Sequence, residues 1–167
     1  MKKTFLFIVI TFSLLICTNG IHAQTNQTKL NQVELMKQFI GSWKCEESKD
    51  TTFYWDAKSY GAGLEGYYKT VTSGKIVSEG KFLQGYDKST DKSIYVELTS
   101  GKDKDIEINA TWFISNTKYR YLLFSDISNF EKASYRIEGE FKSHDMFVET
   151  TIKNNKSTKI ETYTRIK

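Results

Sequence analysis

His144 and Cys45 are the only histidine and cysteine that follow the apolar N-terminal segment of this chain, because His22 and Cys17 lie within that segment. A zinc site needs several such side chains, and a triad needs a nucleophile beside a histidine. The Gly-x-Ser-x-Gly sequence of a hydrolase nucleophile is absent as well. We therefore expect no metal site and no triad, and we interpret Cys45 as a small buried apolar residue.

Glu138 and Glu140 share one face of a predicted strand and resemble the carboxylate pair of a glycoside hydrolase. Arg136 and Lys142 fall on the same face, because strand side chains repeat every two residues. Mixed charges at this spacing are typical of a solvent-exposed row of charged side chains. Ion pairs in such a row contribute little to stability. We therefore do not expect an enzyme, and the alternative of a secreted enzyme would need acids or amides that converge inside the barrel.

Two further segments resemble ligand-binding loops. Residues 61–66 have the Gly-x-Gly-x-x-Gly spacing of a dinucleotide loop, but residues 67–72 predict a strand where the helix should begin. A bent or bulged strand is expected there. Residues 87–91 alternate like the start of a calcium loop, yet Lys92 and Leu98 replace its required Gly and Glu. A hairpin turn is expected instead, and no cofactor is predicted.

Aromatic side chains recur along the predicted strands, and rings with a polar tip suit the lining of a ligand cavity. Arg120 alternates with apolar residues and would bind a ligand carboxylate if its face points inward. Two alternatives stay open: the rings fill the interior or lie outside, and Arg120 has a surface role. The predicted ligand-binding residues are Trp55, Tyr67, Tyr95, Trp112, Arg120, Tyr121 and Tyr135.

Residues 1–23 have the features of a secretory signal peptide: two early lysines, an apolar run at residues 5–16, and Ala23 before the predicted cleavage. The run is shorter than the ~20 residues that span a bilayer, so no transmembrane segment is expected after cleavage. We predict a periplasmic or extracellular protein. Cleavage before Cys17 would give a lipid anchor instead, but the bulky Ile16 disfavours it.

Cleavage leaves residues 24–167, a length typical of one domain. The remaining net charge is about +2 and is spread without a basic block, so nucleic acid is not an expected partner. Cys45 is then the single cysteine, which excludes an intramolecular disulfide. The oligomeric state stays open.

The elements that must position these residues are one short helix and a series of strands. Asn31 and Glu34 match a capping box, and apolar residues three or four apart predict a helix of about ten residues that ends near Gly41. From Trp43 onward, apolar and polar residues alternate with the period of strands. Hairpin-length gaps leave no room for crossover helices. We predict an all-β fold: a single antiparallel up-and-down β-barrel of about eight to ten strands, preceded by the helix.

The order of a helix, Gly41-x-Trp43 and an all-strand chain resembles the calycin superfamily, and within it the lipocalin-like secreted bacterial proteins of unknown function. The resemblance covers residues 29–167. It implies that Trp43 lies across the closed end of the barrel and that Arg165, from the last strand, packs on its ring. Gly41 would let the chain turn tightly into the first strand. These three residues are interpreted as structural closure residues.

A related small barrel, nitrobindin, shares the Gly-x-Trp opening and binds haem through a histidine. His144 lies in a predicted turn, so no haem is expected. Together these observations predict an exported barrel protein that binds or carries a small hydrophobic or amphipathic molecule. The alternative is an envelope structural or interaction protein, with a filled barrel and a macromolecular partner.

Overall fold

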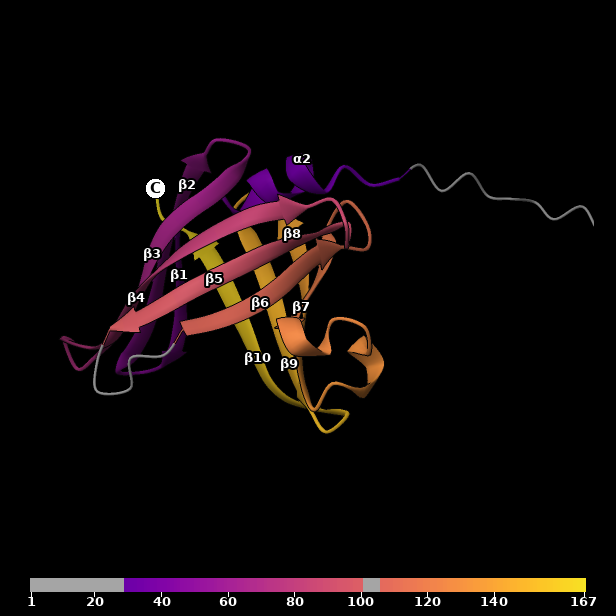
Figure 1. Ribbon diagram of the computed structural model, residues 1–167. Helices are drawn as coiled ribbons and strands as arrows, with labels where there is room; N and C mark the ends of the chain where they lie inside the picture. The colour runs from indigo at the N-terminus through magenta and orange to yellow at the C-terminus, as the bar shows by residue number, and fades with distance from the viewer. Residues whose placement is uncertain (1–28, 101–105) are drawn as a thin grey trace, which may run out of the picture.

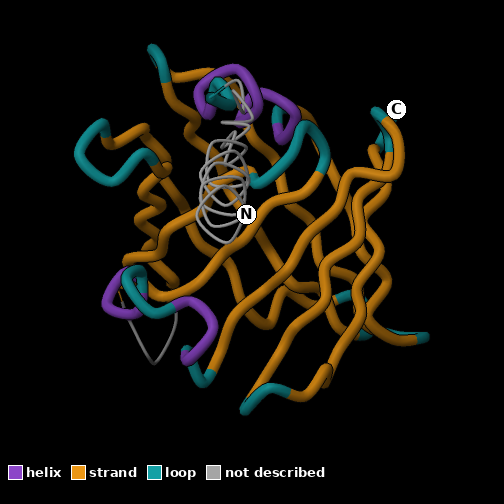
Figure 2. The backbone as a smooth tube through the Cα atoms, turned by 90° about the vertical axis from the view of Figure 1, so that its right-hand side faces the viewer, coloured by secondary structure: helices purple, strands orange, loops and turns teal. Residues whose placement is uncertain are grey.

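The computed structural model describes residues 29–100 and 106–167, and within them ten strands close into a barrel (Figure 1). The predicted signal peptide at residues 1–23 and the alternative lipid-attachment residue Cys17 lie outside the described residues. Figure 2, turned by 90°, shows the strands continuing around the molecule, with helical turns at both of its ends.

The described elements follow the predicted order of one helix and then strands. They are α2 (Gln32–Met36), η1 (Lys37–Phe39), β1 (Gly41–Ser48), β2 (Thr51–Tyr60), β3 (Gly63–Thr72), β4 (Lys75–Asp87), β5 (Lys92–Ser100), β6 (Ile106–Phe113), β7 (Lys118–Leu123), η2 (Phe124–Asp126), η3 (Phe130–Lys132), β8 (Tyr135–Ser143), β9 (Met146–Lys153) and β10 (Lys156–Arg165).

Each strand pairs antiparallel with the next, and β1 pairs with β10 to close the ring. The predicted up-and-down barrel is therefore confirmed, and this architecture is compatible with a lipocalin-like fold. Its ten strands exceed the eight of typical lipocalin barrels, and the diameter of a barrel grows with strand number. The interior is correspondingly wider.

The helix that precedes β1 covers one end of the barrel, which we call the closed end. The side chain of Asn31 accepts a hydrogen bond from the Glu34 amide at 3.2 Å, as the capping pattern predicts. The α-helix is shorter than expected, because the chain tightens into η1 and becomes extended at Ile40. This turn carries Phe39 into the barrel, where it contacts the rings of Phe113 and Phe141.

Alternation along the strands sends one set of side chains inward, where aromatic rings dominate. Cys45 belongs to this set and is 2% exposed, as predicted; burial raises the pKa of its thiol to about 11. The core residues are Met36, Phe39, Trp43, Cys45, Ala57, Leu64, Tyr68, Phe82, Phe113, Tyr119, Phe141, Phe147 and Tyr163.

A smaller core lies on the outside of the barrel, where the segment containing η2 and η3 folds over β6 and β7 (Figure 1). Phe130 packs there against Trp112. Its ring also lies 5.4 Å from the Arg136 guanidinium, which is buried at 8% exposure and donates to Asn155 at 2.9 Å. The expected solvent-exposed row of charged side chains on β8 is therefore wrong at Arg136, because a loop covers this position.

The two loop-like segments form hairpins. Residues 61–66 contain the β2–β3 turn and the start of β3, and no helix follows them. A Cβ at Gly66 would collide with the Asp56 carbonyl, so two backbone segments approach closely here, and the segment contains no bulge. Asp87 caps the β4–β5 turn by accepting from Ser89 and Thr90.

Candidate functional site

A cavity of about 370 Å³ lies inside the barrel, on the far side of Phe39 and Phe147 from the closed end. Ligand pockets occupy about 300 to 1,000 Å³, so this volume suits a small molecule. We call the opposite end, with the β1–β2, β3–β4 and β9–β10 turns, the open end. Aromatic residues in the wall are Phe39, Phe53, Trp55, Tyr95, Tyr119, Tyr121, Tyr135, Phe147 and Tyr163; charged residues are Glu47, Glu97, Glu107, Glu149, Lys159 and Glu161.

A row of rings crosses one side of the interior. Trp55 stacks on Phe82 at a centroid distance of 5.5 Å, and Phe82 stacks on Tyr95 at 4.9 Å. Tyr95 then meets Tyr121 edge to face at 6.1 Å. The four rings come from β2, β4, β5 and β7, so hydrogen-bonded strands fix their positions. Such a row offers flat apolar area to a bound molecule.

Two pairs of glutamates face the same cavity. Glu97 on β5 lies directly opposite Glu107 on β6. Glu149 on β9 lies directly opposite Glu161 on β10. Like charges placed opposite each other in a sheet are destabilising. The pairs therefore need protons or positive groups nearby.

Lys159 supplies one positive charge at the wall. Its ammonium lies 2.9 Å from a Glu47 oxygen and 2.8 Å from a Glu161 oxygen. Burial lowers the pKa of Lys159, but the hydrogen bonds that its ammonium donates to Glu161 and Glu47 outweigh that effect and raise the pKa overall. Lys159 therefore stays charged and is shared between these two carboxylates.

Glu149 is half-buried in the cavity wall, and burial raises the pKa of its carboxyl to about 7. The Tyr119 hydroxyl donates to it at 2.6 Å, which lowers this pKa, while the neighbouring Glu161 raises it. Burial raises the pKa of Glu97 too, and Glu107 adds to the increase. The cavity therefore changes charge near neutral pH.

Three of these glutamates affect the pKa of Tyr121. Burial raises the pKa of its hydroxyl strongly, and the carboxylates of Glu97, Glu107 and Glu149 raise it further. The hydroxyl stays protonated and keeps both a donor and an acceptor in the cavity. The carboxylates of Glu97, Glu107 and Glu149 line the same cavity as this hydroxyl.

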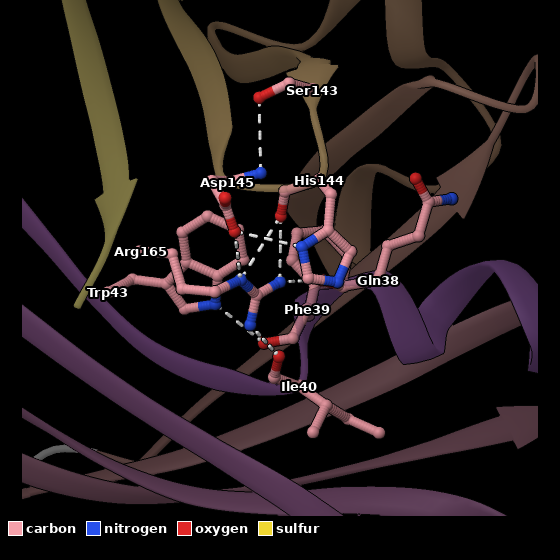
Figure 3. A network of polar contacts seen from close by, with 8 residues as sticks. All are labelled: Gln38, Phe39, Ile40, Trp43, Ser143, His144, Asp145 and Arg165. Atoms are coloured by element: carbon pink, nitrogen blue, oxygen red, sulfur yellow. Dashed lines mark hydrogen bonds and ion pairs between the residues drawn. The ribbon is translucent and has the colours of Figure 1, made fainter. Parts of the chain in front are cut away.

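The closed end holds the Gly-x-Trp residues in a network of contacts (Figure 3). The Arg165 guanidinium lies 4.0 Å from the centre of the Trp43 ring and donates to the carbonyls of Ile40 and His144. Trp43 is fully buried. A Cβ at Gly41, whose φ is +124°, would collide with the Arg165 guanidinium. The network joins β1 to β10 and has no part in the cavity wall.

Four of the residues predicted to bind a ligand line this cavity. All four are on strands, and each presents an aromatic ring to the interior. They are Trp55, Tyr95, Tyr121 and Tyr135.

The other three predicted residues lie outside the cavity wall. Tyr67 faces outward from β3 and borders an external groove. Trp112 packs on Phe130 in the smaller core. Arg120 lies 4.3 Å from the same ring and 3.2 Å from a Glu131 oxygen, so its guanidinium is held on the outer surface.

The charged residues of the cavity are not among those predicted from the sequence. Their signal is the alternation itself: Glu97 follows Tyr95 by two residues, and Glu149 follows Phe147 by two. Each acid therefore continues the inward face of its strand. Acidic residues on strands are ordinarily solvent-exposed, which hides this signal.

In the two described stretches, 29–100 and 106–167, no group of three or more His, Cys, Asp or Glu side chains is arranged to hold a metal ion. The same stretches contain no helix that is both long and apolar enough to cross a membrane. Comparison with protein-family models gives no match, and no curated protein sequence matches the chain significantly.

Proposed function

We propose that this protein is an exported, lipocalin-like barrel of the calycin type that binds a small, partly apolar molecule in its interior. The observation that carries this proposal is the cavity of about 370 Å³, whose wall combines stacked rings with carboxylates and hydroxyls. A barrel that served only as a scaffold would gain stability from apolar side chains at these positions. Binding of a small molecule would explain why the interior keeps a cavity with polar groups in its wall.

The closed end supports the same proposal, because it restricts entry to one side. Trp43 and Phe147 lie 4.8 Å apart, and Phe147 stacks on Tyr163 at 4.4 Å, so rings fill this half of the barrel. Glu107 and Lys159 are exposed and belong to the cavity wall at the other end. A molecule entering past them reaches the row of rings.

Tryptophan fluorescence tests the proposal, because the chain has three tryptophans and only Trp55 lines the cavity. The purified protein would be titrated with neutral, anionic and cationic amphiphiles and with a hydrophobic dye. We expect saturable quenching that Trp55→Phe removes and the matched change Trp112→Phe retains. No saturable response from any probe would reject binding in the cavity.

Export rests on the predicted signal peptide, residues 1–23. Expression of the full chain in a bacterium, followed by cell fractionation and determination of the N-terminus, tests it. The expected mature protein begins at Gln24 and appears outside the cytoplasm. An N-terminus at a lipid-modified Cys17 would establish the anchored alternative.

An external apolar face favours a second candidate, the binding of a macromolecule by the barrel surface. Leu83, Leu98 and Ile106 are 53%, 53% and 68% exposed and border one groove on β4, β5 and β6. Contiguous apolar surface of this kind often marks an interaction site. In this case Leu98→Lys would abolish partner binding, whereas Trp55→Phe would leave it unchanged.

A further inference from the structure

The charges of the cavity are unbalanced among the residues that the structure describes. Five glutamates line it, together with a single basic residue, Lys159. That lysine is held by Glu47 and Glu161. The Glu97–Glu107 pair has no salt bridge within 29–100 and 106–167, although the protein as a whole carries a net positive charge. The negative charge is therefore a local property of the barrel interior.

A second, independent feature points to a bound molecule. The Nδ2 donor of Asn109 has no hydrogen-bond partner in the described parts of the chain, and the residue is 1% exposed. Asn109 lies between Glu107 and Thr111 on the inward face of β6, and both neighbours line the cavity. Buried amide donors are ordinarily paired, since an unpaired one has lost its hydrogen bonds to water without replacing them. Asn109 is not itself part of the cavity wall, but its free donor lies beside that wall, on the inward face that it shares with Glu107 and Thr111.

The arrangement fits an organic cation better than a metal ion. Metal ions need three or more oxygen, nitrogen or sulfur ligands at short distances, and no such group occurs in the described residues. Organic ammonium groups accept looser geometry and also interact with aromatic faces. Both kinds of partner are present here, because Glu97, Glu107 and Glu149 line the same cavity as the ring of Tyr121.

We propose that the cavity takes an amphipathic amine, whose ammonium lies among the carboxylates of Glu97, Glu107 and Glu149. Its aromatic or similarly apolar body lies along the rings of Trp55, Tyr95 and Tyr121, which line the cavity. This inference rests on the proposed function and names its ligand class. An oxygen or other acceptor on the body of the molecule would pair with the free donor of Asn109.

Calorimetric titration with three probes of one shape tests this inference: phenylethylamine, phenylethanol and phenylacetate. They share a phenyl body and differ in charge, which is positive, neutral and negative. We expect the amine to bind about tenfold or more tightly than the alcohol, because charged hydrogen bonds are stronger than neutral ones. The carboxylate should bind most weakly.

Glutamine substitutions locate the effect. Glu97→Gln together with Glu107→Gln keeps the shape of the wall and removes two charges, so the preference for the amine should fall about tenfold. These changes relieve a like-charge pair, and the variant is expected to fold; circular dichroism checks this. Glu138→Gln, on the exposed outer face of β8, is the matched control and should leave the preference unchanged.

The pH dependence gives a readout that overall stability would not mimic. Amine binding should strengthen from pH 5.5 to 8, because Glu149 has a pKa of about 7 and loses its proton in this range. The affinity for phenylethanol should stay the same over this pH range. The titratable groups that face Glu149 are Tyr119 and Tyr121 on β7, Tyr135 on β8, and Lys159, Glu161 and Tyr163 on β10.

Each outcome decides between the two proposals. An amine preference that is lost in the double glutamine variant supports both. Equal binding of phenylethanol and phenylethylamine overturns the amine inference and leaves the proposed function standing. An amine preference that survives in the double variant also overturns the inference. The absence of binding by all three probes, together with no response in the wider fluorescence panel, rejects both.

Discussion

The two halves of the barrel are made by the same ten strands, yet they fill their interiors in opposite ways. At the closed end, rings contact rings and polar groups are paired; Gln32, for example, exchanges two hydrogen bonds with the backbone of Phe113. Toward the open end, inward positions carry glutamates around a cavity. Folding alone favours the first arrangement and opposes the second.

The two halves separate the main source of stability from the proposed binding site. A buried large apolar side chain contributes about 1.5 to 3 kcal/mol, so the closed end is the main source of stability. Carboxylates that face one another lower stability unless protons or cations balance them. We infer that the open half is kept for binding, at some expense to the fold. The following predictions test this division.

The largest effect is expected from Trp43→Ala at the closed end. Trp43 is fully buried, and its ring contacts Phe147 and Arg165, so truncation leaves a large hole. The free energy of unfolding should fall by about 3 to 5 kcal/mol in urea titrations. Trp112→Ala, which affects the smaller outer core, should lower the free energy of unfolding by less. A loss below about 1 kcal/mol for Trp43→Ala would contradict the division.

The next effect belongs to Glu149 and concerns pH. The folded protein holds this proton with a pKa of about 7, against 4.5 for an ordinary glutamate. Stability from this group is therefore fully present below pH 4.5 and is lost as the pH rises through 7. The loss amounts to about 3 kcal/mol at most. Urea titrations at pH 5 and pH 8 measure it.

Glu149→Gln should remove most of this pH dependence and should make the protein more stable than the unmodified chain at pH 8. Part of the dependence will remain, because the pKa of Glu97 is raised as well. Glu138→Gln is the control and should behave like the unmodified protein. An unchanged pH dependence in Glu149→Gln would show that this carboxyl ionises in the folded state as freely as in the unfolded chain.

Local features of the fold could be predicted from the sequence, whereas long-range contacts could not. Alternation after Trp43 and the capping residues Asn31 and Glu34 are local signals, and they gave the helix, the strands and the barrel. Closure of the barrel depends on the pairing of Trp43 with Arg165 across β1 and β10. Only the resemblance to a family suggested that long-range contact.

The cavity was predicted in part, because alternation gives two faces without saying which is inward. Tyr95 and Tyr121 were placed in the site by residue type, and the same reasoning included Tyr67, which borders the external groove instead. Glu97 and Glu149 were missed, although they continue inward faces. The loop that covers Arg136 was missed too, since residues 124–134 have no regular period.

A smaller effect is expected from Arg165→Lys. Lysine keeps the charge but loses the planar group that lies over Trp43 and reaches the carbonyls of Ile40 and His144 together. Stability should fall by about 1 to 2 kcal/mol. Arg120→Lys, on the outer surface, is the comparison and should cost less. Equal losses would mean that the contact with Trp43 adds nothing to closure.

The smallest effect is expected from Asn31→Ala, which removes the cap of α2. The Glu34 amide loses its 3.2 Å partner, and stability should fall by about 1 kcal/mol in urea titrations. Asn31→Ser keeps a capping oxygen and should retain most of the stability. Amine binding measured by calorimetry should stay unchanged in both variants, because α2 lies at the closed end, away from Glu97 and Glu107. A weakened affinity in Asn31→Ala alone would instead couple the two ends, since loosening the helix would then have altered the cavity through Phe39.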